Sequence, residues 1–136
     1  MPAVFACPSF RGSNAGGRPG ENRLTTYIAI SNTGAAFGSS GTRPVRDFSD
    51  GTSDTILVTE VRQSANIWMS PTDVSIAQFQ SEFQHSVGSQ PGTHKDGIQV
   101  LLRDGSARFV LHDTDQKSVD ALTTVAADDS VSDEFQ

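Results

Sequence analysis

GIQVLLRDGSARFVL, residues 97–111, carries the clearest local structural signal in the sequence. Two runs of β-branched and other apolar residues flank Asp104-Gly105, a dipeptide that supplies the positive φ angles of a tight hairpin turn. We therefore predict two antiparallel strands, at about 98–103 and 106–111.

Two further strands are expected upstream of this hairpin. LTTYIAIS (24–31) is β-branched and aromatic, which is typical of a strand. In DGTSDTILVTEVR (50–62) an Asp-Gly turn precedes a run that suits a strand buried on both faces. Residues 1–10 are expected to form a short extended piece.

Helices are expected only near the middle and the end of the chain. Thr72 or Asp73 is expected to cap a short helix through Phe79, followed by a polar stretch over 80–93. Asp113, Thr114 or Asp115 is expected to start a last helix that runs to about residue 127. Its apolar face is Val119, Leu122, Thr123 and Ala126.

Length and charge limit the classes of function. The 136 residues fit a single domain, 1–136, with flexible loops at about 11–23 and 32–44 and an acidic tail at about 128–136. A net charge of −6 repels phosphate backbones, so no nucleic-acid partner is expected.

No stretch approaches the roughly 20 apolar residues that span a bilayer, and no signal peptide is visible. We expect a soluble chain that stays in the cytoplasm or has lost an upstream export segment.

Cys7 is the single cysteine, so no intrachain disulfide is possible. No base stands near it in the sequence. A small buried apolar residue is therefore favoured over a reactive thiol or an intermolecular bridge.

Candidate metal ligands are scattered. His94 pairs with Asp96 or Asp104 as possible zinc ligands, but a histidine bonded to backbone at the hairpin entry is the favoured interpretation. Calcium would use loop aspartates, with Asp50, Asp96 and Asp104 as weak candidates. Turn and cap roles are more common for such residues, so no cofactor is expected.

No pattern of catalytic residues stands out. A GxSxG elbow and a Gly-rich phosphate loop are both absent, and Ser53 near Asp50 and Asp54 is read as turn chemistry. We expect a protein that is not an enzyme. Trp68 is read as a core or rim aromatic, although with His94 it could contact a bound sugar.

Four pieces of the sequence are more informative as an ordered series than singly. They are FACPS (5–9), FSDGTSDTILVTEV (48–61), WMSPTD (68–73) and HKDGIQVLLRDGSARFV (94–110), the last containing His-x9-Asp-Gly. The ordered series resembles a large bacterial family of pilin-like secreted proteins with a prepilin-type His-x9-Asp-Gly C-terminal region. The family's Asn after Thr-Ser is Asp54 here, and the residues after the histidine are Lys95-Asp96.

The resemblance implies a pilin-like α+β domain: an antiparallel sheet with a C-terminal hairpin and a short last helix. It also implies a periplasmic or extracellular place in the cell envelope for the full-length protein, and a link to type II secretion or type IV pilus-like assembly. The family's N-terminal anchor helix, its route to the membrane, is absent from this sequence, so we expect that a longer protein was truncated or that the anchor was lost. The matching motif residues, read as structural, are Asp50, Gly51, Thr52, Ser53, Glu60, His94, Asp104 and Gly105.

Strand pairing gives an independent interpretation of the signature. It would place His94 near residues 112–115, at the end of the hairpin remote from Asp104-Gly105. We expect His94 and Asp104 to have separate structural roles, one at each end of the hairpin, rather than to form a shared catalytic site. The leading hypothesis is a non-enzymatic module that meets other pilin-like or envelope subunits. A solute- or glycan-binding module is the alternative, and a hydrolase ranks last.

Overall fold

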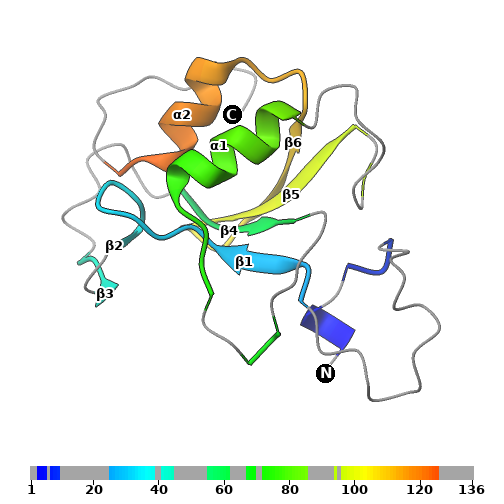
Figure 1. Ribbon diagram of the computed structural model, residues 1–136, viewed down its shortest axis with the longest axis horizontal. Coiled ribbons are helices and arrows are strands. Elements are labelled where there is room, and N and C mark those ends of the chain that lie inside the picture. The colour runs from blue at the N-terminus through cyan, green and yellow to red at the C-terminus, as the bar shows by residue number, and fades with distance from the viewer. Residues whose placement is uncertain are drawn as a thin grey trace.

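A computed structural model describes residues 3–5, 7–9, 25–38, 41–44, 55–61, 67–69, 72–85, 94 and 96–125. These residues form an α+β fold, in which two helices lie on one side of a four-stranded antiparallel sheet of order β1-β4-β5-β6 (Figure 1). The strands are β1 (Tyr27–Ala29), β4 (Ile56–Glu60), β5 (Gly97–Leu102) and β6 (Ala107–Leu111). The helices are α1 (Ile76–His85) and α2 (Gln116–Thr123), and a 3-10 turn, η1, covers Ala3–Phe5.

The predicted C-terminal hairpin is confirmed. Strands β5 and β6 pair from Gly97 opposite Leu111 to Leu101 opposite Ala107. Gly105 takes φ 89° at the turn, a left-handed conformation that glycine adopts without steric cost. The Asp104 carboxylate accepts a hydrogen bond from the Ser106 N–H at 2.8 Å, which fixes the turn.

One face of the sheet carries the core. Alternate residues of β5, namely Ile98, Val100 and Leu102, are buried there with Val110 of β6. They pack against the apolar faces of α1 and α2, contributed by Phe79, Phe83, Val119 and Leu122. The period of two along each strand therefore decides which residues meet the helices.

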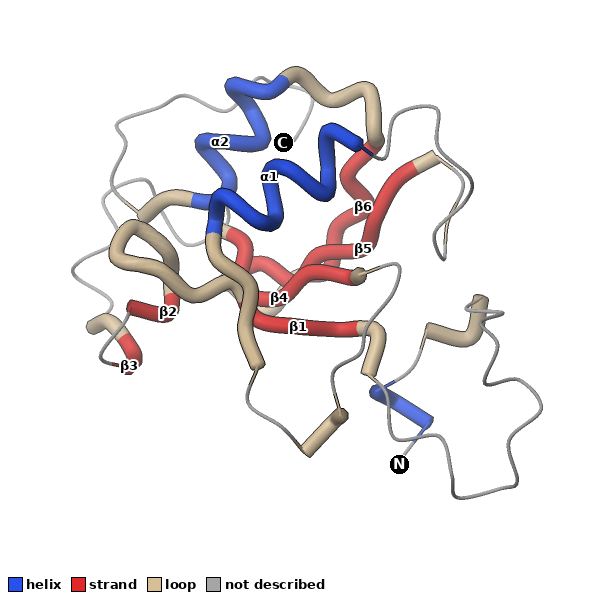
Figure 2. The backbone as a smooth tube through the Cα atoms, viewed as in Figure 1, coloured by secondary structure: helices blue, strands red, loops and turns tan. Residues whose placement is uncertain are grey.

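The same period of two places the alternate residues of each strand on the other face of the sheet, which neither α1 nor α2 covers (Figure 2). The pairing aligns Tyr27 with Glu60, and Gln99 with Phe109, so these four residues share the outer face at one end of the sheet. Leu111 lies at this same end of the sheet and is 47% exposed. Leu101 lies farther from this end and is 36% exposed.

Both helices begin at identifiable caps. Ser75 and Gln78 form a reciprocal capping box, with the Gln78 N–H donating to the Ser75 hydroxyl at 3.2 Å and the Ser75 N–H donating to Gln78 at 2.9 Å. The expected cap at Thr72 or Asp73 and the expected end at Phe79 were therefore wrong, because the capping box lies later and α1 continues to His85. The predicted start of the last helix is confirmed, because Asp115 caps it through the Ser118 N–H at 2.9 Å, but the helix ends at Thr123 rather than at about residue 127.

Three other predictions need correction. Residues 3–5 form a 3-10 turn rather than an extended piece. The segment 32–44 was expected to be a flexible loop, but it contains the short hairpin β2 (Phe37–Gly38) and β3 (Gly41–Thr42), and Ala35 within it is fully buried. The strand expected over 24–31 is shorter, because Ile30 and Ser31 each make only a single bridge.

The expected loop at 11–23 and the acidic tail at 128–136 lie outside the described residues. Among the residues that the structure describes, no helix is long and apolar enough to cross a bilayer.

Two glycines of the hairpin allow a matched test of this geometry. A Cβ at Gly97 would lie 2.3 Å from the Val110 carbonyl oxygen and 2.7 Å from the Phe109 ring, whereas a Cβ at Gly105 would meet nothing within 4 Å. We expect Gly105→Ala to cost about 1–2 kcal/mol of unfolding free energy through its backbone conformation alone, and Gly97→Ala to cost more, because backbone must move. Urea unfolding measures both, and a smaller loss for Gly97→Ala would contradict the close approach of β6 to Gly97.

Candidate functional site

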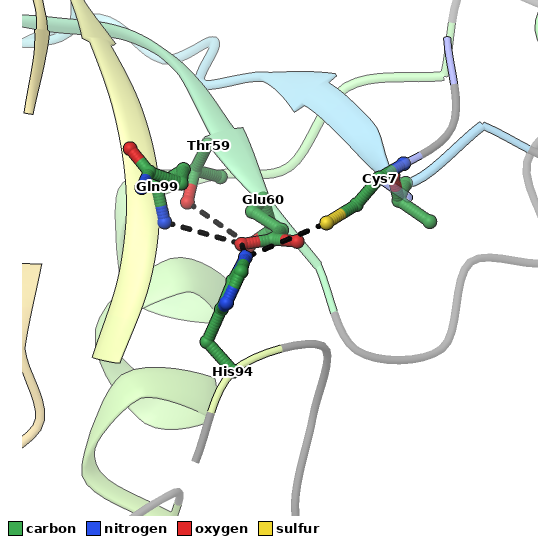
Figure 3. Close-up of polar contacts among 6 residues, drawn as sticks. Cys7, Thr59, Glu60, His94 and Gln99 are labelled. Atoms are coloured by element: carbon green, nitrogen blue, oxygen red, sulfur yellow. Dashed lines mark hydrogen bonds and ion pairs between the residues drawn. The ribbon is translucent and has the colours of Figure 1, made fainter. Parts of the chain in front are cut away.

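Three side chains with metal-binding or acid–base chemistry meet on the outer face of the sheet (Figure 3). The Cys7 Sγ lies 3.4 Å from His94 Nε2, and the same nitrogen lies 3.5 Å from Glu60 Oε2. One ligand atom from each of the three residues falls within 4.8 Å of the other two. We call this group the Cys7–Glu60–His94 cluster.

Each member comes from a different segment. Cys7 is held beside β1, because its backbone N–H donates to the Thr26 hydroxyl at 2.8 Å and the Thr26 N–H donates to the Phe5 carbonyl at 3.2 Å. Glu60 is the last residue of β4. His94 precedes β5, and its ring lies perpendicular to the Phe109 ring at a centroid distance of 5.6 Å.

The Phe109 ring can take this place because Gly97 has no side chain. The ring lies where a Cβ of Gly97 would be, and it packs perpendicular to the His94 imidazole. An edge-to-face arrangement of this kind restricts the orientation of the imidazole. Gly97 therefore contributes to the site as a spacer, a role that the sequence pattern did not predict.

The Glu60 carboxylate is buried, with 4% of the residue exposed. Its Oε2 accepts a hydrogen bond from the Gln99 backbone N–H at 3.2 Å and faces His94, but its Oε1 has no hydrogen-bond partner among the described residues. A buried carboxylate with an unsatisfied oxygen is costly unless a cation or a proton compensates it. Within the described residues, Glu60 Oε1 is therefore left for a proton or a cation to compensate.

The environment of Cys7 keeps its thiol protonated. Burial is the largest factor that raises the pKa of Cys7, and the hydrogen bond and negative charge of Glu60 raise it further. The prediction that Cys7 is buried is confirmed, with 5% of the residue exposed. The expectation that no base lies near it was wrong, because the fold brings His94 to it from 87 positions away.

The arrangement differs from a catalytic triad. In a triad the nucleophile and the carboxylate contact opposite nitrogens of the imidazole, so that the ring takes the proton of the nucleophile while the carboxylate orients the ring. Here the thiol and the carboxylate both face Nε2. Three donor atoms that converge on one point are instead typical of a metal site.

The structure separates the other candidate residues from this cluster. Asp104 and Gly105 lie at the hairpin turn, and His94 precedes the opposite end, where the His112 N–H donates to the Asp96 carbonyl at 2.9 Å. His94 and Asp104 therefore lie at opposite ends of the hairpin, as expected from strand pairing, and the possible zinc pairing of these two residues is not formed. The Asp96 side chain is exposed.

The remaining candidates fall elsewhere. Trp68 is half-buried, and its ring packs on the Phe5 ring at a centroid distance of 5.2 Å, in accord with a rim aromatic. The motif residues Asp50, Gly51, Thr52 and Ser53 lie outside the described residues.

No family model, curated protein or solved structure matches this chain.

Tyr27 is the single tyrosine of the chain and reports on the cluster. Burial, followed by the charge and hydrogen bond of Cys7 and the charge of Glu60, raises the pKa of Tyr27 to about 12. Because the folded state holds the phenol proton more tightly than the unfolded chain, the free energy of unfolding falls as pH rises from about 10 toward 12.

We therefore expect ultraviolet titration of the native protein to show a phenolate midpoint near 12, against about 10 in urea. Cys7→Ala should lower the native midpoint more than Glu60→Gln does, since Cys7 is the larger of the two charge effects. Equal midpoints in the native and urea-unfolded protein would contradict the placement of Tyr27 beside the cluster.

Proposed function

We propose that this chain is the globular domain of a pilin-like cell-envelope protein and that it acts without catalysis, by docking another pilin-like subunit. The full-length protein would lie in the periplasm or outside the cell, and it would belong to a machinery related to type II secretion or type IV pilus-like assembly. An N-terminal helix of the full-length protein would supply its membrane attachment.

The position of the motif residues supports this proposal. Cys7 belongs to the first of the four ordered sequence pieces, Glu60 to the second and His94 to the fourth. Three pieces that are separated along the chain thus contribute to one cluster. This agrees with treating the ordered pieces as parts of a single structural unit, which is what the resemblance implies.

One observation carries the docking function: large apolar side chains are exposed together around Trp68. Val4 is 75% exposed and Met69 is 74% exposed, and their neighbours Phe5 and Ile67 are 37% and 45% exposed. The Phe5–Trp68 ring contact joins the two segments into one surface, which we call the Phe5–Trp68 patch. Exposed apolar surface of this kind is typical of a protein–protein contact.

The chemistry of the cluster favours a role other than catalysis. A nucleophilic cysteine needs a lowered pKa and a base that can accept its proton. The pKa of Cys7 is instead raised, by burial and by Glu60. Burial and Glu60 therefore oppose formation of the thiolate that a nucleophilic cysteine needs.

The alternative function is an extracellular solute- or glycan-binding module centred on Trp68. A sugar-stacking platform needs one free aromatic face, and Phe5 occupies part of the Trp68 surface. A rise in melting temperature with a defined oligosaccharide, lost in Trp68→Ala, would favour this alternative.

Photo-crosslinking in the source cells tests the docking function. We expect benzoylphenylalanine at position 69 of the full-length protein to capture another pilin-like subunit, identified by mass spectrometry, because Met69 stands out from the patch. The matched control is the same group at position 117, since Lys117 is exposed on α2, away from the patch. Equal capture at both positions, or none at position 69, would contradict the proposal.

A further inference from the structure

We propose that Cys7, Glu60 and His94 bind one Zn²⁺ ion, with a fourth position left for water or another small ligand. This property goes beyond the docking function and does not depend on it. Three features support it: the spacing of the three donor atoms, the unsatisfied oxygen of Glu60 and the mixture of donor types.

The spacing fits tetrahedral coordination. Zinc bonds of about 2.3 Å to sulfur and about 2.0 Å to nitrogen or oxygen place neighbouring ligand atoms about 3.3–3.6 Å apart. The Cys7 Sγ to His94 Nε2 distance is 3.4 Å, and the His94 Nε2 to Glu60 Oε2 distance is 3.5 Å. Both separations therefore match edges of a zinc coordination tetrahedron.

The unsatisfied oxygen of Glu60 is the second, independent observation. Glu60 is 4% exposed, and its Oε1 has no hydrogen-bond partner among the described residues. Buried charges are normally paired or coordinate a metal. A cation held between Glu60, Cys7 and His94 would compensate the carboxylate where the structure leaves it uncompensated.

The three side chains can also form a simpler arrangement without a metal ion. A protonated His94 would form an ion pair with Glu60 at 3.5 Å. In that arrangement the Nε2–H of His94 would be shared between Glu60 Oε2 and the Cys7 Sγ, and Glu60 Oε1 would still lack a partner among the described residues. Zinc accounts for all three side chains at once, because it binds a thiolate, a carboxylate and a neutral imidazole through the atoms that converge.

The donor types select the metal. One sulfur, one nitrogen and one oxygen suit Zn²⁺, whereas Ca²⁺ and Mg²⁺ take oxygen ligands. The thiolate and the carboxylate carry two negative charges, which the ion neutralises. Zinc binds the Cys7 sulfur as thiolate, so the thiol proton leaves to solvent as the Zn–S bond forms. No oxidation or reduction is involved.

His94 is the most exposed of the three proposed ligands, so a fourth ligand would be reached most easily from its side. The His94 side chain is 28% exposed, whereas that of Glu60 is 2% exposed. A site with three protein ligands and one accessible position binds an exchangeable ligand more readily than a closed four-ligand site does. Bound zinc would also fasten the segment that carries Phe5 to strand β4, next to the Phe5–Trp68 patch.

Cobalt substitution tests the proposal directly. We expect the untagged, reduced full chain, freed of metal with a chelator, to bind one equivalent of Co²⁺ and to show a thiolate-to-cobalt charge-transfer band with tetrahedral ligand-field bands. Zn²⁺ should abolish these bands and raise the melting temperature, and Ca²⁺ should do neither. Cys7→Ser should remove the charge-transfer band, and Glu60→Gln and His94→Gln should each weaken Co²⁺ binding about 100-fold or more.

The matched control is Asp96→Asn, which removes an exposed carboxylate two residues from His94 and should leave cobalt binding unchanged. Glu60→Gln separates loss of metal binding from loss of folding. Because it removes the unsatisfied buried charge, it should leave the metal-free melting temperature equal to or higher than that of the wild type. The rise in melting temperature with zinc should nevertheless be lost. Wild-type protein that shows no charge-transfer band, or a band that persists in Cys7→Ser, would overturn the proposal. Equal losses in Asp96→Asn and Glu60→Gln would also overturn it.

Discussion

The buried carboxylate of Glu60 is the constraint on which this end of the molecule depends. The antiparallel pairing places Glu60 on the outer face of the sheet, between β1 and β5, where no described helix covers it. Burial there requires polar partners. The Gln99 N–H and His94 supply them on one oxygen, and the segment that bears Cys7 closes over the site. Hydrogen bonds to Thr25 and Thr26 hold this N-terminal segment beside β1 and so place Cys7 next to Glu60 and His94.

The two faces of the sheet perform separate tasks. The inner face packs against α1 and α2 and supplies the apolar burial that stabilises the fold. The outer face holds the Cys7–Glu60–His94 cluster, and the Phe5–Trp68 patch adjoins the same N-terminal segment. Phe5 and Cys7 are two residues apart and are both hydrogen-bonded to Thr26, so the cluster and the patch share one segment.

Local patterns in the sequence predicted the hairpin, the strand that contains Ile56–Glu60 and the last helix, because turn chemistry and apolar periodicity act over a few residues. The start of α1 was missed, since its capping box lies three residues after Thr72. The cluster was missed for a different reason. Cys7, Glu60 and His94 are far apart in sequence and follow no ligand-spacing pattern, so only the tertiary fold brings them together. The resemblance had pointed to all three pieces without indicating that they touch.

The measurement that tests the zinc site most directly is anomalous X-ray diffraction at the zinc absorption edge, from crystals of the untagged protein grown with one equivalent of Zn²⁺. We expect a single strong anomalous peak between the Cys7 Sγ, a Glu60 carboxylate oxygen and His94 Nε2, absent in matched data collected below the edge. A fully ordered cluster with no peak, or a peak bound only by other residues, would contradict the zinc site and leave Glu60 paired with His94 alone.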